Sequence, residues 1–202
     1  LGMSGRLKIL RNNILIKKHD HLVFNFTNNY KLVFNDPRKF GFIDVVRSDK
    51  IKNIRYIKKL GLDALDKNLS IDYLHKKINK SDVPVKQLLL NQYIVAGIGN
   101  IYASEILFLS KINPNKKANL LKKKDCKKII INSRKILLNA IKKGGSSIRN
   151  FKNTSGKKGS FQKDFKVYER KGMNCKRFNC EGTIQKIKIS NRSTFFCNTC
   201  QK

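Results

Sequence analysis

The first 46 residues carry short apolar runs with the alternation that is typical of β-strands. The runs cover residues 7–10, 22–26, 31–34 and 42–46. Turn-forming residues separate them at Asn28–Asn29 and at Asn35–Pro37. Strands joined by connections this short usually lie antiparallel in one sheet. The pattern therefore predicts an antiparallel sheet at the beginning of the chain.

A helix, a glycine turn and a second helix are predicted between Gln87 and Pro114. Leu88–Leu90 form an apolar run that stops at Asn91, and Gly97 and Gly99 supply a turn that can adopt positive φ. Asn100 is placed to cap the second helix, on which Tyr102, Ile106 and Leu109 share one face. Backbone N–H groups at such a helix N-terminus bind anions, and phosphate is the expected anion in so basic a chain. An ordinary structural hairpin fits the same turn, since glycine turns are common.

The longest predicted helix runs from Asp125 to Lys143, after a lysine-rich linker with short helices over residues 48–86. Its apolar face repeats at helical spacing and comprises Cys126, Ile130, Ser133, Leu137, Ala140 and Ile141. Gly144–Gly145 end it. Cys126 lies on this face, so we assign it to the core rather than to a reactive site.

Charge indicates a polyanionic partner. The 202 residues contain 45 Lys and Arg against 13 Asp and Glu, a net charge of +32. Because the cations are spread along the whole chain, they favour a folded basic surface on nucleic acid. The excess of Lys, Asn and Ile is also typical of AT-rich coding sequence, which accounts for part of the charge. No apolar run is long enough to span a bilayer, and no secretory signal begins the chain.

Four cysteines near the end of the chain have the spacing of a zinc site. Cys175 and Cys180 are separated from Cys197 and Cys200 by sixteen residues, in which two strands, 183–189 and 194–196, form a hairpin. Four thiolates on two turns complete a closed tetrahedral site, so the metal is structural. Disulfides are the alternative, but nothing marks the chain as secreted. His19 and His21 flank Asp20 without a third ligand nearby, which favours a solvated loop over a second metal site.

Five segments in this order resemble the formamidopyrimidine-DNA glycosylase family, bacterial enzymes that remove oxidised purines such as 8-oxoguanine. They are LGMSG (1–5), DPRKFG (36–41), GIGNIYASE (97–105), TSGKKG (154–159) and the cysteine hairpin. The resemblance covers essentially the whole chain. DPRKFG together with the upstream methionine favours this branch over the related endonuclease VIII-like enzymes, which act on oxidised pyrimidines.

The resemblance implies an α+β protein in three parts. Residues 1–47 would be the remaining strands of an N-terminal β-sandwich. Residues 48–160 would be a linker and a helix–two-turns–helix DNA-binding domain, and residues 161–202 a zinc finger that holds one Zn²⁺. A monomer in the bacterial cytoplasm, associated with the nucleoid, would bind double-stranded DNA that contains oxidised bases.

Family roles carry over to particular residues. The damaged nucleotide must leave the base stack, and Met3, Arg38 and Phe40 would fill the vacated space. Asn100 and Arg192 would bind one phosphate segment, and the Tyr168 hydroxyl would add a contact. By composition the segment after residue 153 is a flexible linker. By resemblance it would cover the flipped base, through Thr154, Ser155, Gly156, Lys157, Lys158, Gly159 and Ser160.

Two features depart from the family pattern. The family's nucleophile is the amine of an N-terminal proline, which is followed by a glutamate. This chain begins at Leu1 and its prolines are Pro37, Pro84 and Pro114, so we expect no catalytic residue in it and no activity alone. A C-x4-C pair also stands where C-x2-C is usual.

Two other functions are alternatives to a repair enzyme: a module that only binds DNA, and a zinc-ribbon protein that binds RNA.

Overall fold

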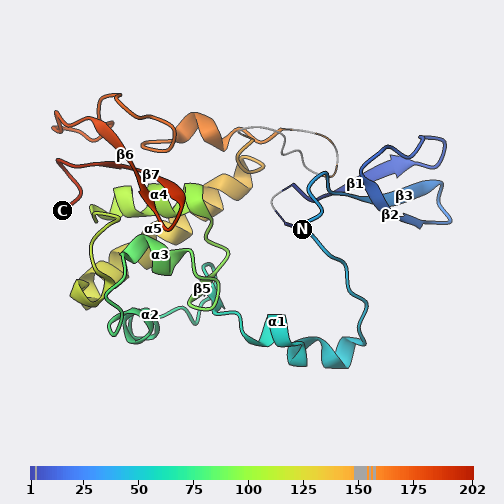
Figure 1. Cartoon of the computed structure of the whole chain (residues 1–202), viewed down its shortest axis with the longest axis horizontal. Helices are drawn as coiled ribbons and strands as arrows, with labels where there is room; N and C mark the ends of the chain where they lie inside the picture. The colour runs from blue at the N-terminus through green and yellow to red at the C-terminus, as the bar shows by residue number, and fades with distance from the viewer. Residues whose placement is uncertain (3, 148–153, 155, 157) are drawn as a thin grey trace. The chain divides into compact units, whose positions relative to one another are not determined.

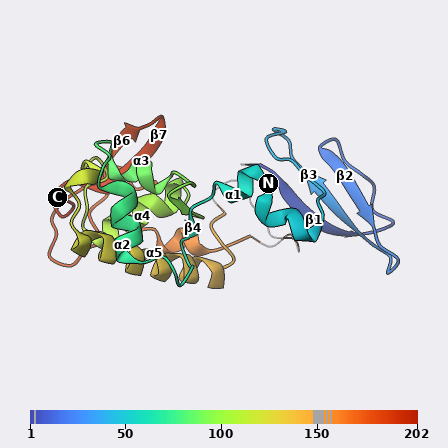
Figure 2. The same ribbon diagram turned by 90° about the horizontal axis from the view of Figure 1, so that it is seen from below.

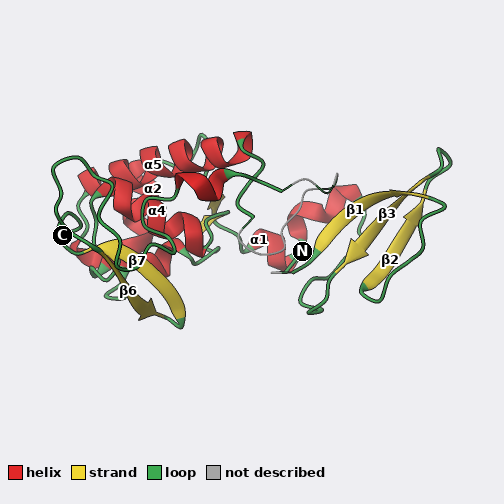
Figure 3. Cartoon of the chain, turned by 90° about the horizontal axis from the view of Figure 1, so that it is seen from above, coloured by secondary structure: helices red, strands yellow, loops and turns green. Residues whose placement is uncertain are grey.

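The computed structural model describes residues 1–2, 4–147, 154, 156 and 158–202 of the chain (Figure 1). The chain folds into two compact units. The first comprises residues 1–48 and 140–164, and the second residues 49–139 and 165–202. The chain contains both strands and helices (Figure 3), and the α+β class is confirmed.

The first unit contains a three-stranded antiparallel sheet in the order β1-β3-β2 (Figure 2). The strands are β1 (Arg6–Arg11), β2 (Asp20–Asn25) and β3 (Tyr30–Asn35). Ile9 of β1 and Phe24 of β2 both pair with Leu32 of β3, which places these apolar side chains on one face. A bulge between Asp20 and Leu22 inserts one residue into β2, so that Asp20 shares the opposite face with Asn35.

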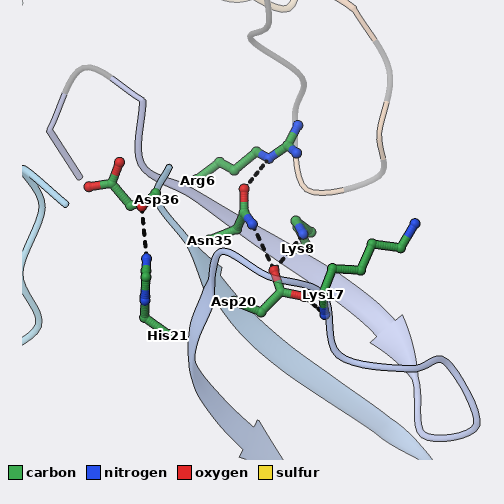
Figure 4. Close-up of polar contacts among 7 residues, drawn as sticks. All are labelled: Arg6, Lys8, Lys17, Asp20, His21, Asn35 and Asp36. Carbon is green, nitrogen blue, oxygen red and sulfur yellow. Dashed lines mark hydrogen bonds and ion pairs between the residues drawn. The ribbon is translucent and has the colours of Figure 1, made fainter. Parts of the chain in front are cut away.

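A polar network on that opposite face joins the three strands (Figure 4). Asp20 accepts hydrogen bonds from Lys8 Nζ at 2.6 Å and from Asn35 Nδ2 at 2.8 Å, and Arg6 Nε donates to Asn35 Oδ1 at 3.0 Å. Burial raises the pKa of the Asp20 carboxyl, but the hydrogen bonds from Lys8, Lys17 and Asn35 outweigh burial and lower it. The carboxylate is therefore charged at neutral pH and ties the ends of the strands together.

The predicted strand at 42–46 is wrong. Residues 41–47 have no regular secondary structure, and Phe42 and Val45 are 63% and 88% exposed. A strand forms only where a neighbouring strand can receive its backbone hydrogen bonds. β3 already has a neighbour on each edge, and the described chain brings neither β1 nor β2 beside residues 42–46. Alternation of apolar residues cannot by itself supply that neighbour.

The second unit is mainly helical. Its elements before the glycine turn are η1 (Ser48–Asn53, whose first residue belongs to the first unit), α1 (Arg55–Lys58), β4 (Leu62–Asp63), α2 (Ile71–Ile78), α3 (Val85–Leu89) and β5 (Val95–Ala96). The later elements are α4 (Asn100–Ser110), η2 (Ala118–Leu120), α5 (Lys123–Lys142), β6 (Ile184–Ile189) and β7 (Arg192–Cys197). The last turn of α5 and η3 (Phe161–Asp164) belong to the first unit.

The long helix α5 packs through a face slightly rotated from the predicted one. Cys126, Ile130, Ser133, Leu137 and Ala140 are buried as predicted, but Ile141 is 64% exposed. Ile129 and Ile136 are buried in its place, so the apolar face is centred toward their side of the helix. Burial raises the pKa of Cys126 to about 11, with Asp125 acting in the same direction, which fits a core thiol. Among the described helices, none combines the length and apolarity that a bilayer-spanning helix requires.

Candidate nucleic-acid interface and zinc centre

The glycine turn before α4 is held by one glutamine. Gly97 adopts φ of +90°, which favours glycine, while Gly99 is extended with φ of −100°. Gln92 Oε1 accepts from Gly97 N at 2.9 Å, and Gln92 Nε2 donates to Ile98 O at 3.1 Å. Only Gly97 therefore fulfils the predicted need for positive φ. The side chain of Gln92 replaces the backbone partners that the turn lacks.

Asn100 does not cap α4 as predicted. It is the first helical residue, Gly99 is the N-cap, and no side chain caps the helix. Asn100 Nδ2 instead donates to the backbone oxygen of Ser193 at 3.0 Å and lies 3.5 Å from the Tyr168 hydroxyl. A capping side chain turns back toward its own helix, whereas this side chain reaches the zinc hairpin. Asn100 thus joins the first turn of α4 to the residue next to Arg192.

A buried lysine completes this group, which we call the anchor cluster: Lys86, Asn100, Tyr168, Ser193 and Thr194. Lys86 is fully buried, and its Nζ donates to Asn100 Oδ1 at 2.7 Å, Ser193 O at 3.1 Å and Thr194 Oγ1 at 2.8 Å. Burial lowers the pKa of Lys86 to about 8, and the charge of Arg192 acts in the same direction. Its three acceptors saturate the three N–H donors of an ammonium group, which fixes the Asn100 amide in one orientation.

A buried carboxylate positions Tyr168. Glu105, on α4 and 3% exposed, accepts hydrogen bonds from the backbone N–H groups of Lys166, Val167 and Tyr168 at 2.8–2.9 Å. Burial raises the pKa of the Glu105 carboxyl, and the three hydrogen bonds offset only part of that shift. The Tyr168 ring packs edge-on against Phe195, with 5.0 Å between ring centroids. Helix α4 therefore fixes both Asn100 and the segment that carries the Tyr168 hydroxyl.

The four predicted cysteines converge on one point. Their sulfur atoms all lie within 4.8 Å of one another, with Cys175 Sγ 3.8 Å from Cys200 Sγ and Cys180 Sγ 3.7 Å from Cys197 Sγ. Four sulfurs at about 2.3 Å from a central zinc would be about 3.8 Å apart, whereas a disulfide needs about 2 Å. The disulfide alternative is therefore excluded, and the donor set fits a tetrahedral metal. This is the one cluster of metal-ligating side chains found in the described part of the chain.

Packing around the cysteines explains how the zinc hairpin reaches α4. Ser190 and Asn191 both have positive φ and form a two-residue turn between β6 and β7. Phe108 of α4 packs with Val167, Ile184, Phe195 and Cys197, and the other three cysteines contact this core. The Arg177 guanidinium lies over the Phe108 ring at 4.7 Å and donates to the Phe108 carbonyl. Arg177, which lies between Cys175 and Cys180 in the chain, thus attaches the metal site to α4.

The LGMSG and DPRKFG segments meet in the first unit. Asp36 is fully buried and accepts from Ser4 Oγ at 2.5 Å, Gly41 N at 2.7 Å and Arg38 N at 3.2 Å. These hydrogen bonds, that from Ser4 first, lower the pKa of Asp36 to about 2. The turn leaves Phe40 61% exposed, with the Arg38 guanidinium 4.6 Å from its ring centroid. Met3 lies outside the described residues, but Gly2 approaches the backbone of Phe40 and Gly41 closely.

The predicted lesion loop is described only in part. Ser155 and Lys157 lie outside the described residues, while Thr154 O accepts from Ile9 N of β1 at 3.4 Å and Gly156 has φ of +78°. Gly159 and Ser160 pair with the end of α5: Ser160 N donates to Lys143 O at 3.0 Å, and Gly159 N donates to Ser147 Oγ at 2.8 Å. The structure therefore places Thr154 beside β1, and Gly159 and Ser160 beside the end of α5.

Three family models match the chain in the order that the segments predict. The formamidopyrimidine-DNA glycosylase N-terminal domain matches residues 1–43, the formamidopyrimidine-DNA glycosylase H2TH domain residues 60–152, and a zinc finger found in FPG and IleRS residues 175–202. The formamidopyrimidine-DNA glycosylase of Rickettsia conorii is 40% identical over 100% of this chain and 72% of its own. The chain belongs to the formamidopyrimidine-DNA glycosylase family.

Other relatives and solved structures agree with this assignment. The Rickettsia bellii formamidopyrimidine-DNA glycosylase is 42% identical over the whole chain and 73% of its own. Lactococcus lactis Fpg in complex with DNA containing an abasic site superposes with a TM-score of 0.90 at 36% identity, covering 100% of this chain and 73% of that one. A mutant of that protein with DNA containing Fapy-dG gives 0.91 at 36% identity and the same coverage. The family assignment and the four-cysteine cluster together identify one structural zinc ion as the cofactor.

Sequence reasoning missed the residues that hold the interface together. Lys86, Gln92 and Glu105 were not among the predicted site residues, although Glu105 belongs to the GIGNIYASE segment. Glu105 had one signal, since an acid on an otherwise apolar stretch of helix is buried only when it is paired or hydrogen-bonded. Lys86 had none, because it is one of 35 lysines in a basic chain.

Proposed function

We propose that this member of the formamidopyrimidine-DNA glycosylase family serves base-excision repair of oxidised purines, 8-oxoguanine and formamidopyrimidines, in double-stranded DNA. In this reading the damaged nucleotide is flipped from the stack, and the family chemistry is N-glycosylase followed by AP lyase. The Lactococcus lactis structures, which hold DNA with an abasic site or Fapy-dG, support this substrate class. The net charge of +32 supplies the attraction to the phosphate backbone.

One observation carries the proposal: the anchor cluster joins the glycine turn to the zinc hairpin. Asn100 is hydrogen-bonded to Ser193 O, and Arg192 precedes Ser193 in the chain. An amide, a guanidinium and the half-buried Tyr168 hydroxyl are thereby offered from neighbouring points of one unit. Arginine can donate two charge-assisted hydrogen bonds to one phosphate, and amide and hydroxyl groups can extend the contact to the next.

The turn at Arg38 suits the space left by a flipped nucleotide. The Phe40 ring is exposed, while the backbone N–H groups of Arg38 and Gly41 donate hydrogen bonds to the Asp36 carboxylate. Phe40 can therefore insert between bases without refolding of the turn. Arg38 would then offer donors to the base that has lost its partner. Met3 would take the remaining place beside them. The loop from Thr154 to Ser160 would cover the flipped base.

We infer that these 202 residues do not include the family nucleophile, which is the amine of an N-terminal proline. Pro37 lies in a turn and Pro84 precedes α3, so neither has a free amine, and Pro114 is likewise internal. The 202-residue polypeptide by itself should therefore bind damaged duplex without forming a Schiff base. Borohydride trapping on 8-oxoguanine DNA checks this directly. A covalent adduct formed by these 202 residues would show that another amine acts.

Binding of Arg192→Ala to duplex DNA tests the shared phosphate site. We expect a roughly tenfold loss of affinity, because a charge-assisted bidentate contact is removed, and a salt dependence weaker by about one counterion. Lys171→Ala removes one exposed cation elsewhere on the zinc finger and serves as the matched control. Zinc content should not change in either variant. Equal losses of affinity in the two variants would mean that Arg192 contributes only unspecific electrostatic attraction to DNA.

As an alternative function, the chain would be a module that binds DNA with the same affinity whether or not a lesion is present. Titration of duplexes that contain 8-oxoguanine, an oxidised pyrimidine or no lesion separates the possibilities. Preference for 8-oxoguanine supports the proposal. Preference for the oxidised pyrimidine would place the chain with the endonuclease VIII-like enzymes, and equal affinity for all three would leave only the binding module.

A further inference from the structure

An arginine without an acidic partner lies beside the four cysteines. Arg177 stands between Cys175 and Cys180 in the chain, and its Nε atom is buried with no hydrogen-bond partner among the described residues. Nor does any carboxylate in that part of the chain form an ion pair with it. Leaving a buried N–H group of a charged side chain without a partner costs free energy. The guanidinium is therefore suited to a negative group at the cysteines themselves.

Helix α4 fixes the position of this side chain. The guanidinium carbon of Arg177 lies 4.7 Å from the centroid of the buried Phe108 ring, and Nη2 donates to the Phe108 carbonyl oxygen. The same carbonyl accepts from Lys111 N at 3.1 Å, at the C-terminal end of α4. A helix C-terminus carries partial negative charge, which favours a cation. The ring, the carbonyl and the helix end together hold the guanidinium in one place.

Two of the four cysteines contact this arginine. The Arg177 side chain hydrogen-bonds Cys200, and the Arg177 backbone N–H hydrogen-bonds Cys175. Both contacts favour a thiolate over a thiol, because a hydrogen-bond donor and a positive charge stabilise a negative sulfur. Four thiolates around one Zn²⁺ carry more negative charge than the metal neutralises. The guanidinium thus lies where it offsets part of that excess charge.

We propose that Arg177 is the counter-charge of the zinc centre and slows the release of zinc from the chain. A thiolate that leaves the metal takes up a proton, and a hydrogen bond from a neighbouring cation makes that exchange less favourable. Arg177 is a positioning residue and not a ligand, since the four sulfurs complete the tetrahedral donor set. The inference concerns the metal centre alone and does not depend on which DNA lesion the chain binds.

The test follows the transfer of zinc from the zinc-loaded chain to the chromogenic chelator pyridylazoresorcinol. We expect Arg177→Gln, which removes the charge, to release zinc about tenfold faster, as when a group that supports a metal ligand is lost. Arg177→Lys keeps the charge but not the planar fork, so its rate should lie between those of Arg177→Gln and the parent chain. Phe178→Ala is the matched control, because it changes the next residue, which is 90% exposed, and should release zinc at the parent rate.

Cobalt(II) in place of zinc reports the geometry of the site, because its absorption bands differ between a complete tetrahedral four-thiolate site and a distorted one. We expect the bands of the parent chain in every variant. Loss of these bands in both Arg177 variants would mean that the arginine is required to build the site, which would overturn the proposed effect on release. Equal acceleration in Arg177→Lys and Arg177→Gln would also overturn it, since lost packing and not lost charge would be the cause. A parent-like rate in Arg177→Gln would remove the role altogether.

Discussion

The anchor cluster and the Arg38 turn hold candidate DNA-binding residues by opposite means. In and beside the anchor cluster, buried charged side chains contact the candidate residues directly: Lys86 is hydrogen-bonded to Asn100, and Glu105 accepts from the backbone N–H of Tyr168. In the Arg38 turn, which comprises residues 36–41, the buried Asp36 carboxylate accepts hydrogen bonds from the backbone N–H groups of Arg38 and Gly41. Phe40 is left exposed.

This difference fits two different tasks on DNA. A phosphate lies at a fixed place on the duplex surface, so a binding residue gains from being locked in one orientation. A side chain that enters the base stack must move into a space that opens only when a nucleotide flips, so a firm turn with a free tip is suitable. The comparison implies that disturbing the buried groups damages the first site more than the second.

Removal of zinc should have the largest effect and should be confined to the anchor cluster. Structural zinc contributes roughly 10 kcal/mol to folding in isolated fingers. We expect chelation or Cys197→Ser to release β6 and β7, and with them the partners of Lys86 and Asn100. Amide hydrogen exchange by mass spectrometry should show lost protection over residues 184–197 and unchanged protection over β1–β3. Equal loss in the sheet would show that the two regions do not fold separately.

Glu105→Gln should have an intermediate effect. The replacement amide directs its NH₂ group at a backbone N–H and leaves at least one buried donor unsatisfied, which costs about 2–3 kcal/mol. Thermal unfolding followed by circular dichroism measures the loss. Glu169→Gln, at an exposed position, is the control and should leave the midpoint unchanged. Identical midpoints for both variants would mean that the carboxylate does not support the Tyr168 segment.

The effect of Asp36→Asn should be confined to the Arg38 turn and should alter the pH dependence of that turn. Its pKa is lowered from 3.8 to about 2, so the carboxylate stabilises the fold above about pH 4. That stabilisation is lost as the pH falls through about 2. The Gly41 amide proton shift, followed by NMR, should titrate in this window in the parent chain and stay flat in the variant. Asp82→Asn, exposed in the other unit, should not affect it.

Local sequence patterns predicted the positions of helices and strands better than they predicted which segments contact one another. β1, β2, β3, α5 and the zinc hairpin lie where alternation and helical spacing placed them. The strand at 42–46 failed because pairing depends on another edge. The Asn100 cap failed because the Asn100 amide donates to the backbone oxygen of Ser193 in β7 and accepts from Lys86. The predicted DNA contacts of Met3, Arg38, Phe40, Asn100, Tyr168 and Arg192 stay predictions.

By itself, the sequence determined the zinc ligands, the glycine turn and the order of the family segments. Each of these depends on residue type and short spacing, which a linear chain displays directly. Only the tertiary structure decided that Lys86 holds the anchor cluster and that Glu105 holds the Tyr168 segment, because their partners lie up to 108 residues away in the chain. The sequence does not show which partners a buried charge meets, because its role comes from the donors and acceptors that folding brings within about 3 Å.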